Sequence, residues 1–314
     1  MQTYIEGEDD SPMSRDEEFL IHTPTQPIPY YNEKLFDIIG NIFKVKPSEL
    51  TTKIPESLID KILLSTNSNG RYNIDVTSEG AHYFMGYPDC NFMHQLTAIL
   101  TLWNERLIFP VTYLTMAEME DSTACEIERL NQLTEEVNDV FKSISTESQI
   151  DSYKKVKELL IALDIRGFMT IFGFRTSPGS QDAPWPKKSV ILDAVNKKHK
   201  KDRIKPRVVH PNNTSILTVG GRALAKHSSR SVDKFWGNCD GKTESYKNEA
   251  AFAIVQQILN ECVWMNVHII PGDKIVIECR NNYKLDDTFK GYGVRWTIDG
   301  EFIGFLDGYR SASP

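Results

Sequence analysis

The sequence has no apolar run approaching the roughly 18 residues that a membrane-spanning helix requires. Its best candidate, Phe168 to Phe174, is interrupted by Thr170 and Gly173. The five cysteines are scattered without a CxxC pair, which is typical of free thiols in a reducing compartment. The acidic first 20 residues also lack the basic and then apolar layout of a secretion signal. We therefore expect a cytoplasmic or nuclear protein with no membrane contact.

Motifs for metal and nucleotide chemistry are also missing. The seven histidines form neither HxxxH nor HExxH and have no cysteine pair beside them, so we predict no metal site. Gly237 to Thr243 has three residues between its glycines where a P-loop has four, and no clear strand precedes it. This spacing excludes P-loop nucleotide hydrolysis, and the sequence indicates no particular cofactor.

The chain does contain two charge clusters of opposite sign. Its net charge is −7, and the first 20 residues hold seven acids against Arg15. Residues 187–207 instead hold nine Lys or Arg residues against two Asp residues. This basic segment can contact phosphate or an acidic partner, and its few aromatics predict only weak, nonspecific contact with nucleic acid. It also resembles a bipartite nuclear-import signal, although a solvated helix and linker explains the charges equally well.

Hydrophobic periodicity divides the chain into four parts. Residues 1–30 are acidic and rich in proline, which predicts a flexible arm. Residues 31–175 show helical spacing and predict a mostly helical domain. Residues 176–214 are a basic, proline-containing connector, and residues 215–314 are an α+β domain. The helical signals of the second part cover residues 31–46, 57–64, 92–109, 116–141 and 156–165.

The last hundred residues change from helical to strand patterns. Asn248 is the expected N-cap of a helix that reaches Val263, and a short strand is expected before Gly220. The Asp299-Gly300 pair predicts a tight hairpin turn. The fold class is therefore α+β, with a mostly helical N-terminal part and a C-terminal antiparallel β-meander. The expected strands cover residues 264–269, 274–280, 294–298 and 301–306.

Strand alternation predicts one apolar and one polar face for this meander. The polar face carries Asn266, His268, Glu278, Arg280 and Arg295. An imidazole, a carboxylate and two guanidinium groups on one surface can bind an anion and transfer protons. A half-solvated sheet with a merely polar outer face explains the same alternation.

A second group of polar residues follows Gly220 and Gly221. A strand that ends in two glycines before a helix can direct backbone N–H groups at phosphate, although a glycine pair also forms ordinary turns. His227 is a candidate general base. The expected ligand-binding residues around it are Arg222, Lys226, Arg230 and Trp236.

Seven blocks in the C-terminal third resemble a eukaryotic protein family in their order. They are LTVGGRALAKHSSRS, FWGNCDG, KNEAAFAIV, WMNVHIIP, IECR, GYGVRW and FIGFLD, within about residues 215–307. The resemblance implies no activity and no cofactor. It supports treating the polar positions in these blocks as one site.

Three functions remain open. The leading expectation is an intracellular protein that binds an anionic, phosphate-bearing ligand or a protein partner on the Arg/His/Trp surface described above. A second is a hydrolase or transferase with His227 or His268 as general base, in which Arg280 and Arg295 stabilise developing negative charge. A third is a structural subunit whose polar face is an interface. Glu278 is the expected third catalytic residue, beside the two histidines.

Overall fold

The first predicted apolar stripe lies on α1 (Glu33–Val45), where Leu35 and Ile39 are fully buried. The Asn32 side chain begins this helix by accepting a hydrogen bond from the Leu35 N–H at 2.9 Å. The structure is a computed structural model that describes residues 31–64, 74–77, 80–113, 120–146, 148–199, 215–230, 234–281, 284–285, 288–289 and 291–308. The predicted arm at residues 1–30 and residues 200–214 of the predicted connector lie outside these ranges.

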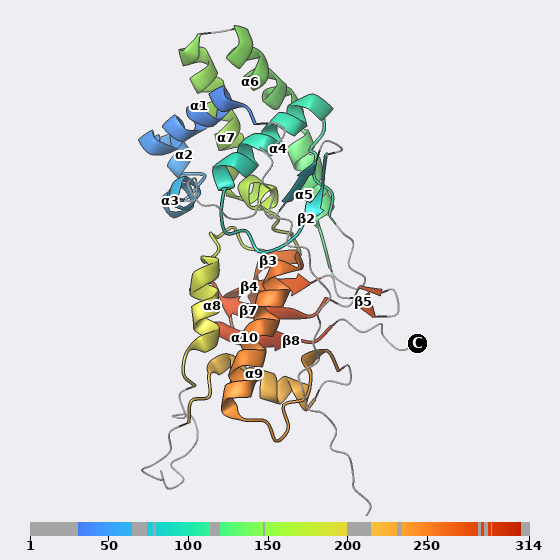
Figure 1. The fold of residues 1–314 in the computed structure, drawn as a ribbon. Helices are drawn as coiled ribbons and strands as arrows, with labels where there is room; N and C mark the ends of the chain where they lie inside the picture. The colour runs from blue at the N-terminus through green and yellow to red at the C-terminus, as the bar shows by residue number, and fades with distance from the viewer. Residues whose placement is uncertain are drawn as a thin grey trace, which may run out of the picture.

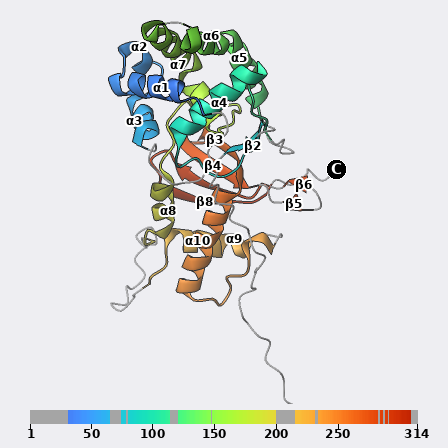
Figure 2. The ribbon, with the colours of Figure 1, turned by 45° about the horizontal axis from the view of Figure 1, so that its top comes forward.

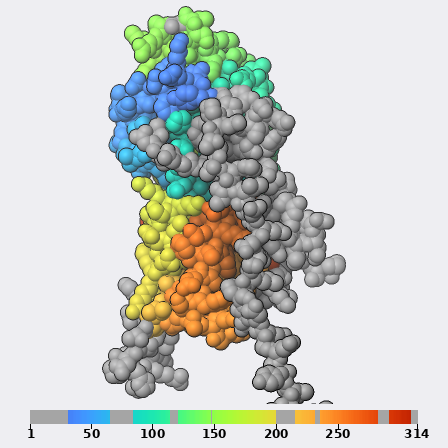
Figure 3. Space-filling view, viewed as in Figure 1, coloured from blue at the N-terminus to red at the C-terminus, as the bar shows by residue number. Residues whose placement is uncertain are grey.

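Helices dominate the N-terminal part, which forms one end of the molecule in Figures 1 and 2. The space-filling view shows these helices above the yellow and orange helices of the C-terminal part (Figure 3). A short antiparallel hairpin, β1 with β2, accompanies them. After α1, the elements are α2 (Ser48–Thr51), α3 (Glu56–Leu64), β1 (Ile74–Thr77), β2 (Gly80–Phe84), α4 (Phe92–Arg106), α5 (Thr123–Asn131), α6 (Thr134–Thr146) and α7 (Gln149–Ile171).

Two helix predictions are corrected. The single helix expected at residues 116–141 is two helices, α5 and α6, and residues 114–119 lie outside the described ranges. The first helix ends at Asn131. The carbonyl of this residue accepts a hydrogen bond from the Thr134 hydroxyl, and its side chain accepts one from the Phe109 N–H. Buried Leu130 and Val137 keep helical spacing across this break, so periodicity alone did not reveal it. The helix expected at residues 156–165 is the longer α7, interrupted at Asp164 with φ 51°.

The C-terminal part is built on a four-stranded antiparallel sheet of order β3-β4-β7-β8, and the predicted α+β fold is confirmed. The helix α10 crosses one face of this sheet, with α8 beside it (Figure 1). The elements are α8 (Lys188–Asn196), α9 (Val219–Ser228), the 3-10 turn η2 (Lys234–Trp236), α10 (Glu244–Asn260), β3 (Cys262–Ile270), β4 (Lys274–Asn281), β5 (Lys284–Leu285), β6 (Thr288–Phe289), β7 (Gly293–Thr297) and β8 (Phe302–Leu306). The cap of α10 is Thr243, and Asn248 lies inside the helix.

The apolar face of the sheet packs against these helices. Val267, Ile277 and Trp296 lie in one cross-strand row, and all three are fully buried. The Trp296 indole N–H donates to the Ile191 carbonyl of α8 at 3.0 Å. Because this face is covered by helices, the opposite face is the one available to carry the polar residues.

The first part of the predicted connector is an edge of the sheet. Phe174 forms a parallel bridge with Met265, and Ser180 forms an antiparallel bridge with His268. The Gln181 N–H donates to the Val267 carbonyl at 2.7 Å. Further along, Trp185 and Ile191 are buried in the core. Residues 174–195 are therefore part of the folded structure and do not act as a simple linker.

Gly220 and Gly221 lie in the first turn of α9, so the strand expected before them is absent from this described segment. The Gly221 N–H donates to the Thr218 hydroxyl at 3.0 Å, which leaves this donor satisfied. A Cβ on Gly220 would overlap the Val195 side chain, and one on Gly221 would overlap the Asn248 side chain. The glycines allow α9 to pack closely on α8 and α10, and they do not form the expected phosphate-binding turn.

We expect Gly220→Ala to lower the free energy of unfolding by about 1 to 3 kcal/mol, because the added methyl group overpacks this contact. Gly40→Ala on α1 is the matched control, since its Cβ would have only Met93 Cε at 3.9 Å as a neighbour. The control should gain up to about 1 kcal/mol from alanine's helix propensity. Urea unfolding of both variants checks the opposite signs, and a neutral Gly220→Ala would contradict the close packing.

Lys61 on α3 connects the helical part to the segment before α8. Its ammonium group donates to the Trp185 carbonyl and lies 4.3 Å from the centroid of the Trp185 ring. Beside it, the Tyr87 hydroxyl donates to the Pro186 carbonyl at 2.6 Å. Burial lowers the pKa of the Lys61 amine to about 7, with the Asp89 charge opposing this shift and the Lys187 charge adding to it.

This pKa predicts a pH-dependent stability. Between about pH 7 and the ordinary lysine value of 10.5, the unfolded chain binds more protons than the folded chain, so the free energy of unfolding rises with pH. Lys61→Met should remove this rise, and Lys53→Met, at an exposed position of the same region, should retain it. Urea unfolding between about pH 7 and 10 measures the slope. Equal slopes in wild type and Lys61→Met would contradict a buried, weakly basic amine.

Candidate functional site

Glu278 lies at the centre of the polar face, with only 2% of its side chain exposed. Its Oε1 accepts from Arg280 Nε at 2.5 Å, and its Oε2 accepts from Arg295 Nε at 3.0 Å. His268 Nε2 lies 3.2 Å from the same Oε2. Register explains this convergence, because Glu278 is opposite Arg295 on β7 and Arg280 is two residues further along β4. We call these four residues the Glu278 cluster.

The electrostatics of the Glu278 cluster favour a permanent carboxylate. Burial raises the pKa of the Glu278 carboxyl, but the hydrogen bond with His268 and the charges of Arg280 and Arg295 outweigh it. Together they hold this pKa well below its usual range. One carboxylate and two guanidinium groups leave the Glu278 cluster with surplus positive charge, which suits contact with an anion.

A second polar cluster lies where β8 ends. Asp307 Oδ1 accepts from the Trp236 indole N–H at 2.8 Å and lies 3.7 Å from His227 Nδ1. The His227 ring packs edge to face on Trp236 and on Phe305, with centroids 5.7 and 6.0 Å away. Because 28% of the His227 side chain is exposed, a ligand can reach this imidazole. We call His227, Trp236 and Asp307 the Asp307 cluster.

Arg280 joins the two clusters. Its Nε donates to Glu278, and its Nη1 donates to the Gly291 carbonyl at 2.5 Å and to the Asp307 carbonyl at 3.2 Å. With 5% exposure, Arg280 is held rigidly inside this network. The polar residues of the meander and those around His227, which lie far apart in the sequence, are therefore contiguous in space.

The two candidate histidines do not converge on one point. His268 is on β3 and Asp307 follows β8, and these are the outer strands of the sheet. Three strand spacings correspond to about 14 Å. Both residues are at the C-terminal ends of strands that run in opposite directions, so they also lie at opposite ends of the sheet. One phosphate group cannot contact His227 and His268 together, so at most one of them transfers a proton at a given phosphate.

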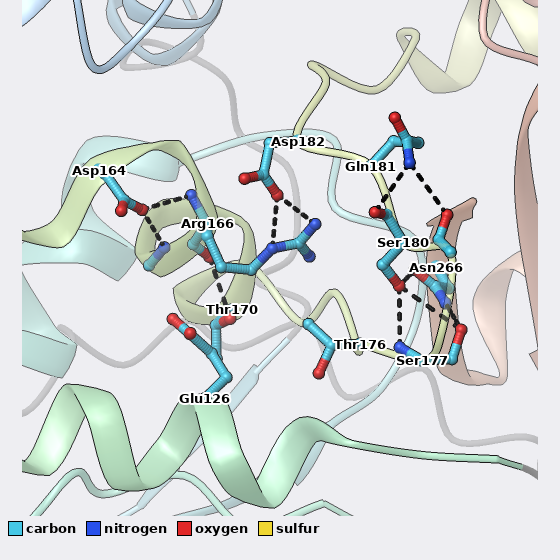
Figure 4. A network of polar contacts seen from close by, with 12 residues as sticks. Glu126, Asp164, Arg166, Thr170, Thr176, Ser177, Ser180, Gln181, Asp182 and Asn266 are labelled. Carbon is cyan, nitrogen blue, oxygen red and sulfur yellow. Dashed lines mark hydrogen bonds and ion pairs between the residues drawn. The ribbon is translucent and has the colours of Figure 1, made fainter. Parts of the chain in front are cut away.

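The other predicted site residues have different environments. Asn266 is fully buried, donates to the Ser177 hydroxyl at 2.7 Å and accepts from the Ser180 hydroxyl at 2.8 Å. Figure 4 shows these contacts beside the ion pair of Arg166 with Asp182. The segment before α8 thus covers this end of the polar face. The remaining candidates are Trp236, which is 1% exposed, and the exposed Arg222, Lys226 and Arg230 of α9 and the turn after it.

Asp307 is the functional candidate that the sequence analysis missed. Strand alternation does not mark it, because it lies just beyond the last residue of β8. Its partners come from α9 and η2, about 70 to 80 positions earlier in the chain. An acidic residue directly after a strand is the only local signal.

Within the ranges that the structure describes, no three His, Cys, Asp or Glu side chains gather as ligands for a metal ion. In that part of the chain, no helix is long and apolar enough to cross a membrane.

Residues 209–307 match the model of the CdiA C-terminal tRNase toxin domain family. The match covers just under a third of the chain and includes every residue of the two polar clusters. No curated protein and no solved structure matches the chain. The similarity of this segment is therefore to a toxin domain that cleaves tRNA.

This finding corrects the expectations from sequence. The leading function, an anion-binding protein, and the structural-subunit alternative are both wrong as the main function of this segment. The matched family is a tRNase toxin domain family. Nothing supports the expected likeness to a eukaryotic family. The nuclear-import-like signal is likewise unsupported, and Ala194 and Val195 of its intervening residues are buried in α8. An anionic partner remains compatible, because RNA is a polyanion.

Replacing Glu278 by glutamine should show what its charge does. At pH 7 we expect Glu278→Gln to lower the free energy of unfolding by about 3 to 5 kcal/mol, because Arg280 and Arg295 then lose the buried carboxylate to which both donate. The stabilisation is fully present above the ordinary carboxyl pKa of 4.5 and is lost as pH falls through the lower folded value. The difference between wild type and variant should therefore shrink in acid.

Urea unfolding at neutral and acid pH measures this difference. Glu301→Gln is the matched control, since Glu301 is exposed on the same meander and should cost little. A Glu278→Gln variant as stable as wild type at neutral pH would show that the Glu278 cluster contributes nothing to the fold.

Proposed function

We propose that residues 215–308 form an RNA-cleaving domain with tRNA as its substrate and toxicity as its effect. The single observation that carries this proposal is the match of residues 209–307 to the tRNase toxin domain family. Both polar clusters fall within it, and the helical part before residue 176 lies outside it. We propose the helical part, residues 31–175, as a separate module, although residues 174–181 extend the sheet edge.

RNA cleavage requires proton transfer and stabilisation of charge on a phosphate. A base must take the proton of the attacking oxygen, an acid must protonate the leaving oxygen, and cations must stabilise the negative charge between these events. An imidazole suits the proton transfers because its ordinary pKa lies near neutrality. The two polar clusters supply both an imidazole and guanidinium groups.

His227 is the better candidate for proton transfer. It is partly exposed, and the Asp307 carboxylate 3.7 Å from Nδ1 can orient the ring. Asp307 is in turn held by the Trp236 N–H, and its backbone carbonyl is held by Arg280. Four elements of the domain thus converge to fix this imidazole.

The Glu278 cluster supplies the positive surface beside it. Arg295, with 22% of its side chain exposed, is the guanidinium that a phosphate can approach. Glu278 acts here as a positioning residue, since a carboxylate with a strongly lowered pKa orients arginines and does not donate protons at neutral pH. His268 is the second candidate for proton transfer, because 17% of its side chain is exposed beside Arg295.

The substrate and a partner follow from this function. A chain that cleaves tRNA would damage the cell that makes it, so we expect a protein that blocks the site in that cell. The outer surface of the Asp307 cluster is where such a blocker would prevent access to His227.

The test is cleavage of tRNA by the purified full chain, followed by gel analysis of the products. His227→Ala should slow cleavage by about 10² to 10⁴-fold, the usual contribution of general acid–base catalysis. His268→Ala should have a smaller effect if its role is only to hold Glu278. His94→Ala, in the helical part outside the family match, is the matched control and should cleave at the wild-type rate.

Thermal unfolding of each variant identifies losses of activity that come from misfolding. Wild-type protein that leaves tRNA intact under all conditions would refute the proposed function. Full activity in His227→Ala with loss in a folded His268→Ala would move the proton transfer to the Glu278 cluster.

A further inference from the structure

Three cations form a stripe along α9 and the turn that follows it. Arg222, Lys226 and Arg230 are spaced by four residues, and all three are exposed. Four residues advance a helix by about 6 Å and rotate it by about 40° beyond one turn, so the three side chains lie on one slowly turning line. The Arg230 N–H donates to the His227 carbonyl at 3.0 Å, which continues the helical turn past Ser228. We call these residues the α9 stripe.

The α9 stripe has no acidic partner among the residues that the structure describes. No ion pair there involves Arg222, Lys226 or Arg230, in contrast to the two arginines that hold Glu278. Cations near a helix C-terminus do complement the helix dipole, which accounts for Lys226 and Arg230. Arg222 lies in the first half of α9, where the dipole gives it no such advantage. The helix dipole therefore explains two of the three cations and not Arg222.

The stripe leads to His227. His227 follows Lys226 directly and precedes Arg230 by three residues, so Arg230 lies next to it one turn further along. The line of charges is about 12 Å long. This length fits several successive phosphates of an RNA strand that passes along α9 and reaches the partly exposed imidazole.

We infer that the α9 stripe binds the sugar-phosphate backbone of RNA beside the cleaved position. This inference rests on the proposed function and adds how the substrate is held. The stripe contributes affinity and orientation through phosphates alone, so the strength of binding depends on salt and not on base sequence. His227 and the Glu278 cluster remain responsible for the reaction.

The experiment compares two triple charge reversals in the full chain. One variant carries Arg222→Glu, Lys226→Glu and Arg230→Glu. Its matched control carries Lys34→Glu, Lys44→Glu and Lys53→Glu, at three exposed positions of the helical part. A milder variant with glutamine at the three stripe positions removes the charge and retains good helix formers, so folding is preserved.

Steady-state cleavage of tRNA is measured against RNA and salt concentration. We expect KM to rise at least tenfold in both stripe variants, with kcat within about twofold of wild type and no change in the control. The slope of log KM against log salt should fall by about two, because three phosphate contacts are lost and each contact to a single strand contributes about 0.7 to the slope. Gel shifts of uncleaved tRNA in a His227→Ala background should show the same loss of affinity.

Two results would overturn the inference while leaving the proposed function intact. Unchanged KM and salt slope would show that the stripe faces another partner, such as an acidic protein. A fall of kcat with unchanged KM would place these cations at the reacting phosphate. Absence of cleavage by wild type would instead refute the proposed function, and the gel shifts would still test RNA binding by the stripe.

Discussion

The buried carboxylate of Glu278 is the interaction on which the polar face depends. Two guanidinium groups and an imidazole converge on its two oxygens. Without this negative charge, Arg280 would be a buried cation and the central strands would carry facing positive groups. Removing the Glu278 charge would therefore lower the stability of the fold strongly, because a charge taken out of water needs a partner of opposite sign. The same pairing gives the surface its rigidity.

A chain of polar contacts through Arg280 connects Glu278 to His227. The guanidinium of Arg280 bonds to Glu278 on one side and to the Asp307 carbonyl on the other. The Asp307 side chain then orients the imidazole and accepts from Trp236. Preorganisation of this type matters for catalysis, since groups held in place need no rearrangement when charge develops. It also explains why residues from α9, η2, β4 and the end of β8 have to be present in one domain.

The cations of this domain fall into two groups that differ in their partners. Arg280 and Arg295 form ion pairs with the Glu278 carboxylate, whereas the cations of the α9 stripe are exposed and form no ion pair with any described side chain. Paired and buried guanidinium groups give precise geometry, and free surface cations give long-range attraction that salt screens. The RNA-cleaving function proposed above would use both, because a polyanionic substrate must first be captured and then placed at one phosphate.

The sequence by itself determined the α+β class, the strands of the meander and the composition of its polar face, because alternation along a strand is a local property that the backbone imposes. Three features were decided only by tertiary structure: the break between α5 and α6, the role of Gly220 and Gly221 in helix packing, and the position of Asp307 beside His227. Each depends on residues distant in the chain, such as Val195 against Gly220. Periodicity reports which side of an element is buried, but it carries no information about which other element covers that side.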